Sequence, residues 1–178
     1  MRVSYLRTGT TPISDVYAYI EDDPIKALAK AAYDGVQNRV LISFSALKEL
    51  RRIIGFTQMR FYCNKRNVKK IDVFTKENAE GHKVVDFFTN DDIGRPAACG
   101  SFETTYLDDS AIAKNCDQWA YGTWGHLNDT GNTRLYGPVA YIGGKHHFIM
   151  GGYHRFECDD YVYESDFQTI GVWAIFVR

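Results

Sequence analysis

The sequence lacks the features of nucleic-acid-binding and membrane-spanning proteins. Its 178 residues carry 21 lysines and arginines against 22 aspartates and glutamates, which gives a formal net charge of −1. Without a global positive field, nucleic acids and anionic membrane surfaces are poor partners on electrostatic grounds. No apolar run approaches the roughly 20 residues that a transmembrane helix needs, so we expect no transmembrane segment.

No leader, repeat, linker or low-complexity tract divides the chain. The first twenty residues lack the apolar stretch of a signal peptide, so we expect either a protein that is not exported or a chain whose leader has been removed. The length is sufficient to bury one full core. We therefore expect a single domain over residues 1–178, with a helical N-terminal flank at 1–42 and a β-rich, lectin-like region at 43–178.

Motifs of the common enzyme classes are also missing. The sequence contains no G-x-S-x-G, H-E-x-x-H or G-x-G-x-x-G motif and no phosphate-binding loop with a lysine. The cysteines and histidines show no spacing that would identify a Cys–His nucleophile pair, and disulfide formation would remove the thiol that such a pair needs. Zinc is disfavoured because His146 and His147 are adjacent and would point to opposite sides of a strand. We expect a protein that is not an enzyme.

Aromatic residues, in contrast, are abundant. They make up 15% of the chain, with 12 tyrosines, 11 phenylalanines and three tryptophans. Such a composition suits β-strands, and it also suits a surface that recognises a ligand by stacking.

The pattern along the chain predicts an α+β fold, predominantly antiparallel β-sheet with a few short helices. Capping residues and apolar spacing predict helices at 23–35, 45–54 and 109–119, the last of them capped by Asp109 or Ser110. Short β-branched or aromatic runs at 56–63, 70–75 and 83–88 predict a meander. Short strands should follow between 124 and 163, with turns at Gly143-Gly144 and Gly151-Gly152. The apolar run at 170–178 predicts a central strand buried on both faces.

Four widely spaced cysteines indicate that disulfides stabilise this fold. Three pairings are open to Cys63, Cys99, Cys116 and Cys158, and no pair has C-x-x-C spacing. Cys99 and Cys116 are the closest in sequence, so we expect Cys99–Cys116 and Cys63–Cys158. The alternative is four buried free thiols. A single N-glycosylation sequon at 128–130 adds weak support for export.

The acidic run Glu157 to Asp160 is the first candidate site. Strand alternation would place Cys158 and Asp160 on one face, and Glu157 beside Asp159 on the other. Both arrangements require a positive partner, because buried or adjacent carboxylates are costly. Calcium is one candidate, bound by Glu157, Asp159 and Asp160 with Asp129. The alternative is pairing with an arginine, for which Arg60, Arg134 and Arg155 are available.

A second candidate site is the aromatic and glycine-rich stretch 119–126. Trp119, Trp124 and a tyrosine lie within it, and His126 ends it. Sugars stack an apolar face on an aromatic ring while their hydroxyl groups bind polar side chains or calcium. We therefore expect sugar contacts from two groups of residues, namely Trp119, Trp124 and His126, and Tyr153, His154 and Arg155. The alternative role for each tryptophan is core packing.

Six segments of the chain resemble a group of secreted cnidarian proteins from corals and sea anemones. These segments are 56–63, 98–101, 109–116, 123–126, 155–160 and 172–178. The resemblance covers roughly residues 43–178 and includes all four cysteines. It implies two internal disulfides and an extracellular, secreted location. The group is similar in turn to calcium-dependent, galactose-binding sea anemone lectins, whereas segment 23–35 has no counterpart in it.

Together these observations predict a carbohydrate-binding, lectin-like protein that uses calcium and binds glycans of the galactose type. A homodimer would supply the avidity that weak sugar binding needs. Two alternatives stay open. The aromatic residues could line a pocket for a small ligand or pigment, or the chain could be an extracellular matrix protein.

Overall fold

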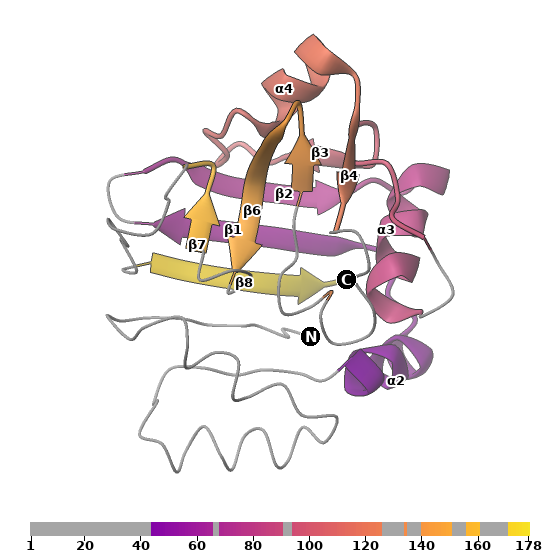
Figure 1. Cartoon of the computed structure of the whole chain (residues 1–178). Coiled ribbons are helices and arrows are strands. Elements are labelled where there is room, and N and C mark those ends of the chain that lie inside the picture. Colours follow the sequence, from indigo (N-terminus) through magenta and orange to yellow (C-terminus); the bar gives the residue numbers. More distant parts are fainter. Residues whose placement is uncertain are drawn as a thin grey trace.

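The computed structural model describes residues 44–65, 68–90, 94–125, 134, 140–150, 156–160 and 171–178. This part of the chain forms three helices and two four-stranded antiparallel sheets (Figure 1), which confirms the predicted disulfide-stabilised α+β class. The helix expected at 23–35 and the turn at 151–152 lie outside the described residues. The helices are α2 (Phe44–Ile54), α3 (Ala79–Thr89) and α4 (Ile112–Trp119).

The first sheet has the strand order β3-β2-β1-β8. Its strands are β1 (Met59–Lys65), β2 (Lys70–Thr75), β3 (Phe102–Thr104) and β8 (Gly171–Val177). β8 pairs with β1 and is the last strand of this sheet among the described residues, whereas a central position was expected for it. Its apolar sequence reflects burial at the sheet edge, where Ala174 and Ile175 are both covered although they lie on successive positions.

The second sheet has the order β4-β5-β6-β7. Its strands are β4 (Gly122–Trp124), β5 (Ala140–Ile142), β6 (Lys145–Met150) and β7 (Phe156–Cys158). The predicted turn at Gly143-Gly144 joins β5 to β6. Both glycines have positive φ, 58° and 79°, as a tight two-residue hairpin turn requires.

Helix α3 replaces the strand expected at 83–88. The side chain of Asn78 caps the helix by accepting a hydrogen bond from the backbone N of Gly81. Val84 and Phe88 then recur at helical spacing and are fully buried. Gly81 is needed because a Cβ atom there would lie 2.0 Å from the Lys76 carbonyl oxygen. A short run of valine and phenylalanine satisfies both periodicities, and the cap decides between them.

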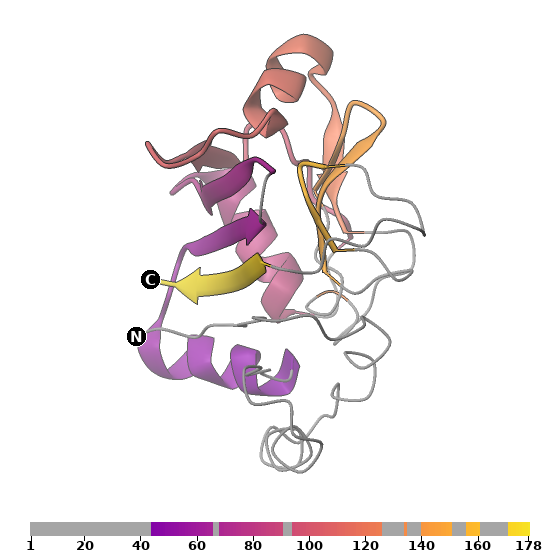
Figure 2. The same ribbon diagram turned by 90° about the vertical axis from the view of Figure 1, so that its left-hand side faces the viewer.

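The two sheets form separate layers with an aromatic core between them (Figure 2). Phe61 of β1 lies at its centre, with ring centroids 4.5 Å from Trp124 of β4, 5.3 Å from Phe88 of α3 and 5.7 Å from Phe148 of β6. The indole Nε1 of Trp124 donates to the Ser101 hydroxyl, so its one polar atom is satisfied inside the core.

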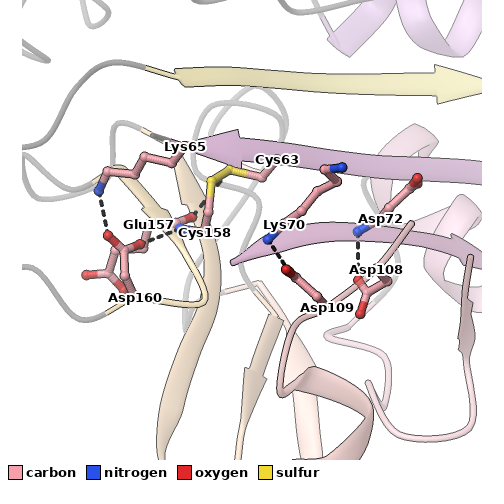
Figure 3. The surroundings of a disulfide bond; sticks show 9 residues. All are labelled: Cys63, Lys65, Lys70, Asp72, Asp108, Asp109, Glu157, Cys158 and Asp160. Atoms are coloured by element: carbon pink, nitrogen blue, oxygen red, sulfur yellow. Dashed lines mark hydrogen bonds and ion pairs between the residues drawn. A yellow bond between two sulfur atoms is a disulfide. The ribbon is translucent and has the colours of Figure 1, made fainter. Parts of the chain in front are cut away.

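Both predicted disulfides are present, and all four cysteines are used. Cys63–Cys158 joins β1 of the first sheet to β7 of the second across 95 residues (Figure 3). Cys99–Cys116 joins the turn before β3 to helix α4. The disulfides therefore fix the second sheet and α4, the two elements that carry the candidate sites.

Candidate functional site

The acidic run departs from strand geometry after Cys158. β7 ends there, and Asp159 has φ 63°, a left-handed conformation that aspartate tolerates better than most residues. Simple alternation of faces therefore stops before Asp159 and Asp160. Asp159 nevertheless contacts β6 and the start of α4, and Asp160 contacts β1.

Asp159 is buried and holds three elements together. Its Oδ1 accepts from Nδ1 of His147 at 2.5 Å and lies 3.3 Å from Nζ of Lys145, both on β6. Its Oδ2 accepts from the backbone N of Ala111 at 2.6 Å, at the start of α4. Burial raises the pKa of the Asp159 carboxyl, but the bonds from His147 and Ala111 and the charge of Lys145 outweigh this and lower the pKa below its usual value.

The N-terminus of α4 is capped differently from what the sequence predicts. Asp109 or Ser110 was predicted to cap this helix, but the N-cap residue is Ala111, which has no side-chain cap. Asp108 and Asp109 instead accept from the backbone N atoms of Asp72 and Lys70 and so bind the chain to β2 (Figure 3). Asp159, 48 residues away in sequence, supplies the acceptor at the helix start.

Asp160 pairs with Lys65 beside the Cys63–Cys158 disulfide (Figure 3). Its Oδ2 lies 2.7 Å from Nζ of Lys65, whose side chain is 1% exposed, and its Oδ1 accepts from the backbone N of Cys158. Lys65 follows Cys63 by two positions, as Asp160 follows Cys158. The ion pair and the disulfide therefore connect the same two segments, β1 and the end of β7.

These contacts supply the positive partners that the acidic run requires. The partner of Asp160 is Lys65, and that of Asp159 is Lys145 together with His147. Of the arginines expected as the alternative, Arg60 binds Asp72 and Arg134 binds the carbonyls of Phe87 and Asn90, whereas Arg155 lies outside the described residues. A calcium ion does not fit the carboxylates of Asp159 and Asp160, since all four oxygens already accept hydrogen bonds. Glu157 is buried nearby.

Across the described ranges, no group of three or more His, Cys, Asp or Glu side chains is placed to hold a metal. Asp129, the fourth expected ligand, lies outside these ranges. Sugar ligands His126, Tyr153, His154 and Arg155 lie outside them as well, and their roles stay predictions.

The two tryptophans of the second candidate site have opposite environments. Trp124 is fully buried in the aromatic core, so the expectation that it stacks on a sugar is wrong, and core packing is its role. Trp119, the last residue of α4, is 48% exposed. Strand alternation within β4 turns Trp124 inward, whereas the end of a short helix leaves Trp119 at the surface.

Trp119 belongs to an exposed group with Tyr121 and Tyr141, which we call the aromatic platform. Tyr121 is 53% exposed, and its ring lies edge-on to Trp119 with centroids 6.1 Å apart. Trp119 rests on the β5–β6 turn, because a Cβ atom on Gly143 would lie 2.7 Å from its ring. Tyr141 precedes that turn on β5, is 37% exposed and pairs with Thr123 across β4.

Polar groups border the aromatic platform. His146 of β6 lies opposite Tyr141, with ring centroids 4.9 Å apart, and the half-buried Thr123 of β4 lies opposite Tyr141 on the other side of β5. Tyr141 and His146 were not predicted as site residues. The turn at Gly143-Gly144 was the signal that could have found them, because a two-residue hairpin turn fixes which residues on the two strands face each other.

Three contacts hold the platform on the core. The bond from Ala111 to Asp159 fixes the start of α4, the Cys99–Cys116 disulfide fixes its middle, and the Asn115 side chain lies 3.0 Å from Nε2 of His147. The backbone N of Ala120, which has φ 53°, donates to the Cys116 carbonyl and closes the helix. Trp119 is therefore presented by an anchored element, as a binding site requires.

Comparison of the chain with protein-family models, with curated proteins and with solved structures finds no match. Among the described helices, none is both long enough and apolar enough to cross a membrane.

Proposed function

We propose that the protein is an extracellular carbohydrate-binding protein that stacks glycans on the aromatic platform. The observation that carries the proposal is the exposure of three large rings around the β5–β6 turn, namely the contacting pair Trp119 and Tyr121, and Tyr141 on the strand that leads into the turn. Groups of neighbouring exposed apolar side chains mark interaction sites more often than single ones do, and rings beside polar groups match the mixed surface of a sugar. The two disulfides suit an oxidising compartment, which supports the extracellular assignment.

The platform offers the two kinds of contact that sugar binding needs. Trp119 and Tyr121 present rings set at 82° to each other, so a pyranose that lies on one ring meets the edge of the other. His146 and Thr123 supply hydrogen-bonding groups next to Tyr141. Contacts of this size give weak affinity, and two platforms in a homodimer would raise it by avidity.

Trp119→Ala tests the platform directly. We expect wild-type protein to bind one or more glycans on an array, with galactosides the first class to examine, and the variant to bind about tenfold or more weakly because the largest ring is lost. Tyr106→Ala is the matched control, since Tyr106 is 94% exposed but lies on the loop after β3. Absence of glycan binding by the wild type, or equal losses in both variants, would reject the proposal.

Removal of divalent metal is a second test. The carboxylates of Asp159 and Asp160 are occupied by lysines, histidine and backbone N–H groups, so we expect EDTA to leave glycan binding within about twofold of its value in calcium. Array or titration measurements in the two buffers check this. A loss of binding in EDTA would return calcium, and Asp129, to the site.

Gly143→Ala should weaken glycan binding although it leaves all three aromatic residues of the platform in the sequence. A Cβ atom at Gly143 would collide with Trp119 and displace it from the platform. Gly144→Ala is the matched control, because Gly144 also has positive φ but its Cβ would meet only the Tyr141 hydroxyl, at 4.0 Å. Similar thermal stability of the two variants, with binding lost only in the first, is the expected result. Equal glycan binding by both variants would show that the packing of Trp119 against the turn does not contribute to binding.

A further inference from the structure

A separate groove of about 580 Å³ lies on the first sheet, on the face that points away from the core. Its apolar lining comes from Phe74 of β2, Phe176 of β8 and the loop residues Tyr106 and Leu107. These positions alternate with the buried residues Val73 and Ile175, which face the second sheet. The volume falls within the range of about 300–1,000 Å³ that is typical of small-molecule sites.

Two arginines line this groove, and only one of them has its charge balanced. Arg60 donates through Nε and Nη2 to both oxygens of Asp72, each at 2.6 Å, and its guanidinium also lies 5.3 Å from the ring centre of Phe176. That ion pair neutralises Arg60 within the protein. Arg60 therefore serves as part of the wall.

Arg178 differs because the only hydrogen bond that its side chain makes within the described residues is to a neutral group. Its Nε donates to Oε1 of Gln58 at 2.5 Å, and its guanidinium lies 4.9 Å from the ring centre of Phe74. Glu77 and Glu103 line a shallow hollow on its other side, but no carboxylate in the described residues comes within ion-pair distance of it. The guanidinium of Arg178 is thus a cation held in a fixed position. Within the described residues, neither of its terminal nitrogens pairs with a carboxylate.

We propose that this groove binds a planar apolar molecule that carries one carboxylate. The molecule's ring system would lie among Phe74, Phe176 and Leu107, and its carboxylate would accept hydrogen bonds from the terminal nitrogens of Arg178. A guanidinium and a carboxylate match each other in a two-point contact. Stacking on Phe74 and the bond to Gln58 hold the guanidinium in place before the ligand arrives, so less side-chain freedom is lost on binding.

A titration with two matched probes tests the assignment. We expect 2-naphthoate to bind the wild-type protein about tenfold more tightly than neutral 2-naphthalenemethanol, as followed by naphthyl fluorescence. Arg178→Gln should remove the preference for the acid, whereas Arg178→Lys should keep part of it. Arg52→Gln is the control, because Arg52 is an exposed arginine that pairs with Glu49 on α2, away from the groove.

Leu107→Trp provides a readout that does not depend on Arg178. The larger side chain should fill the groove and weaken both probes at least about fivefold, while urea denaturation and glycan binding stay as in the wild type. No binding of either probe, equal affinity for the two probes, or an unchanged preference in Arg178→Gln would overturn the assignment. Retention of both probes by Leu107→Trp would also overturn it, by placing them elsewhere. Trp119→Ala separates this site from the aromatic platform, because it should leave naphthoate binding unchanged.

Discussion

Replacing both Cys63 and Cys158 with alanine is expected to lower the free energy of unfolding by about 2–5 kcal/mol. The disulfide joins positions 95 residues apart and thereby restricts the unfolded chain strongly. It is also the covalent link between β1 of the first sheet and β7 of the second, next to the buried Lys65–Asp160 ion pair. Urea denaturation of the double variant, monitored by tryptophan fluorescence, measures the loss.

The second disulfide provides the control for this prediction. Cys99 and Cys116 are 17 residues apart, so the loop-length relation assigns their bond about 1.5 kcal/mol less stabilisation than Cys63–Cys158. The Cys99→Ala/Cys116→Ala variant should therefore unfold at a higher urea concentration than the first variant. If it were the less stable of the two, local packing of α4 would outweigh chain entropy, and the explanation by loop length would be wrong.

The disulfide pattern and the fold class could be predicted because they depend on features that the sequence displays directly. Four cysteines allow only three complete pairings, and the closest pair in sequence is favoured by its short loop. Most of β1 alternates between residues that are buried and residues that are not, β2 is rich in β-branched and aromatic residues, and the Gly143-Gly144 pair indicates a tight turn. Each of these signals is local, and the structure confirms each of them.

The errors arise where tertiary contacts decide. The run 83–88 fits a strand or a helix, and the cap at Asn78 and the close approach of Gly81 to Lys76 select the helix. The apolar sequence of β8 reports burial but not position in the sheet. For short, wholly apolar segments, hydrophobic pattern alone cannot distinguish an edge strand that is covered from a central strand.

The candidate site shows the same division. Physical reasoning correctly required a positive partner for the acidic run, because unpaired carboxylates are costly in a protein interior. The identity of the partners could not be predicted, since Lys65 and Lys145 come from different sheets and reach Asp160 and Asp159 only in the folded chain. Likewise, one aromatic-rich stretch placed Trp124 in the core and Trp119 at the surface, and only the alternation within β4 separates them.

Asp159→Asn is expected to lower the free energy of unfolding by about 2–3 kcal/mol at pH 7. Asparagine tolerates the left-handed conformation at this position, so the substitution removes charge without adding backbone strain. The amide has one acceptor oxygen, which cannot serve His147 and the backbone N of Ala111 on opposite sides. Either β6 or the start of α4 then loses its partner inside the protein, and urea denaturation should register the loss.

The stability difference between wild type and Asp159→Asn should depend on pH in a defined direction. Because the pKa of Asp159 is lower in the folded protein than the usual value of about 3.9, the charged carboxylate stabilises the fold above that pH, and the contribution is lost as pH falls through the lower folded value. The difference should therefore be constant from about pH 7 to pH 5 and shrink below about pH 4. Asp117→Asn, an exposed change on the same helix, should stay within about 0.5 kcal/mol of the wild type. A difference that grew toward acid pH would mean that folding favours the protonated acid, and that His147 and Lys145 do not bind Asp159 as a carboxylate.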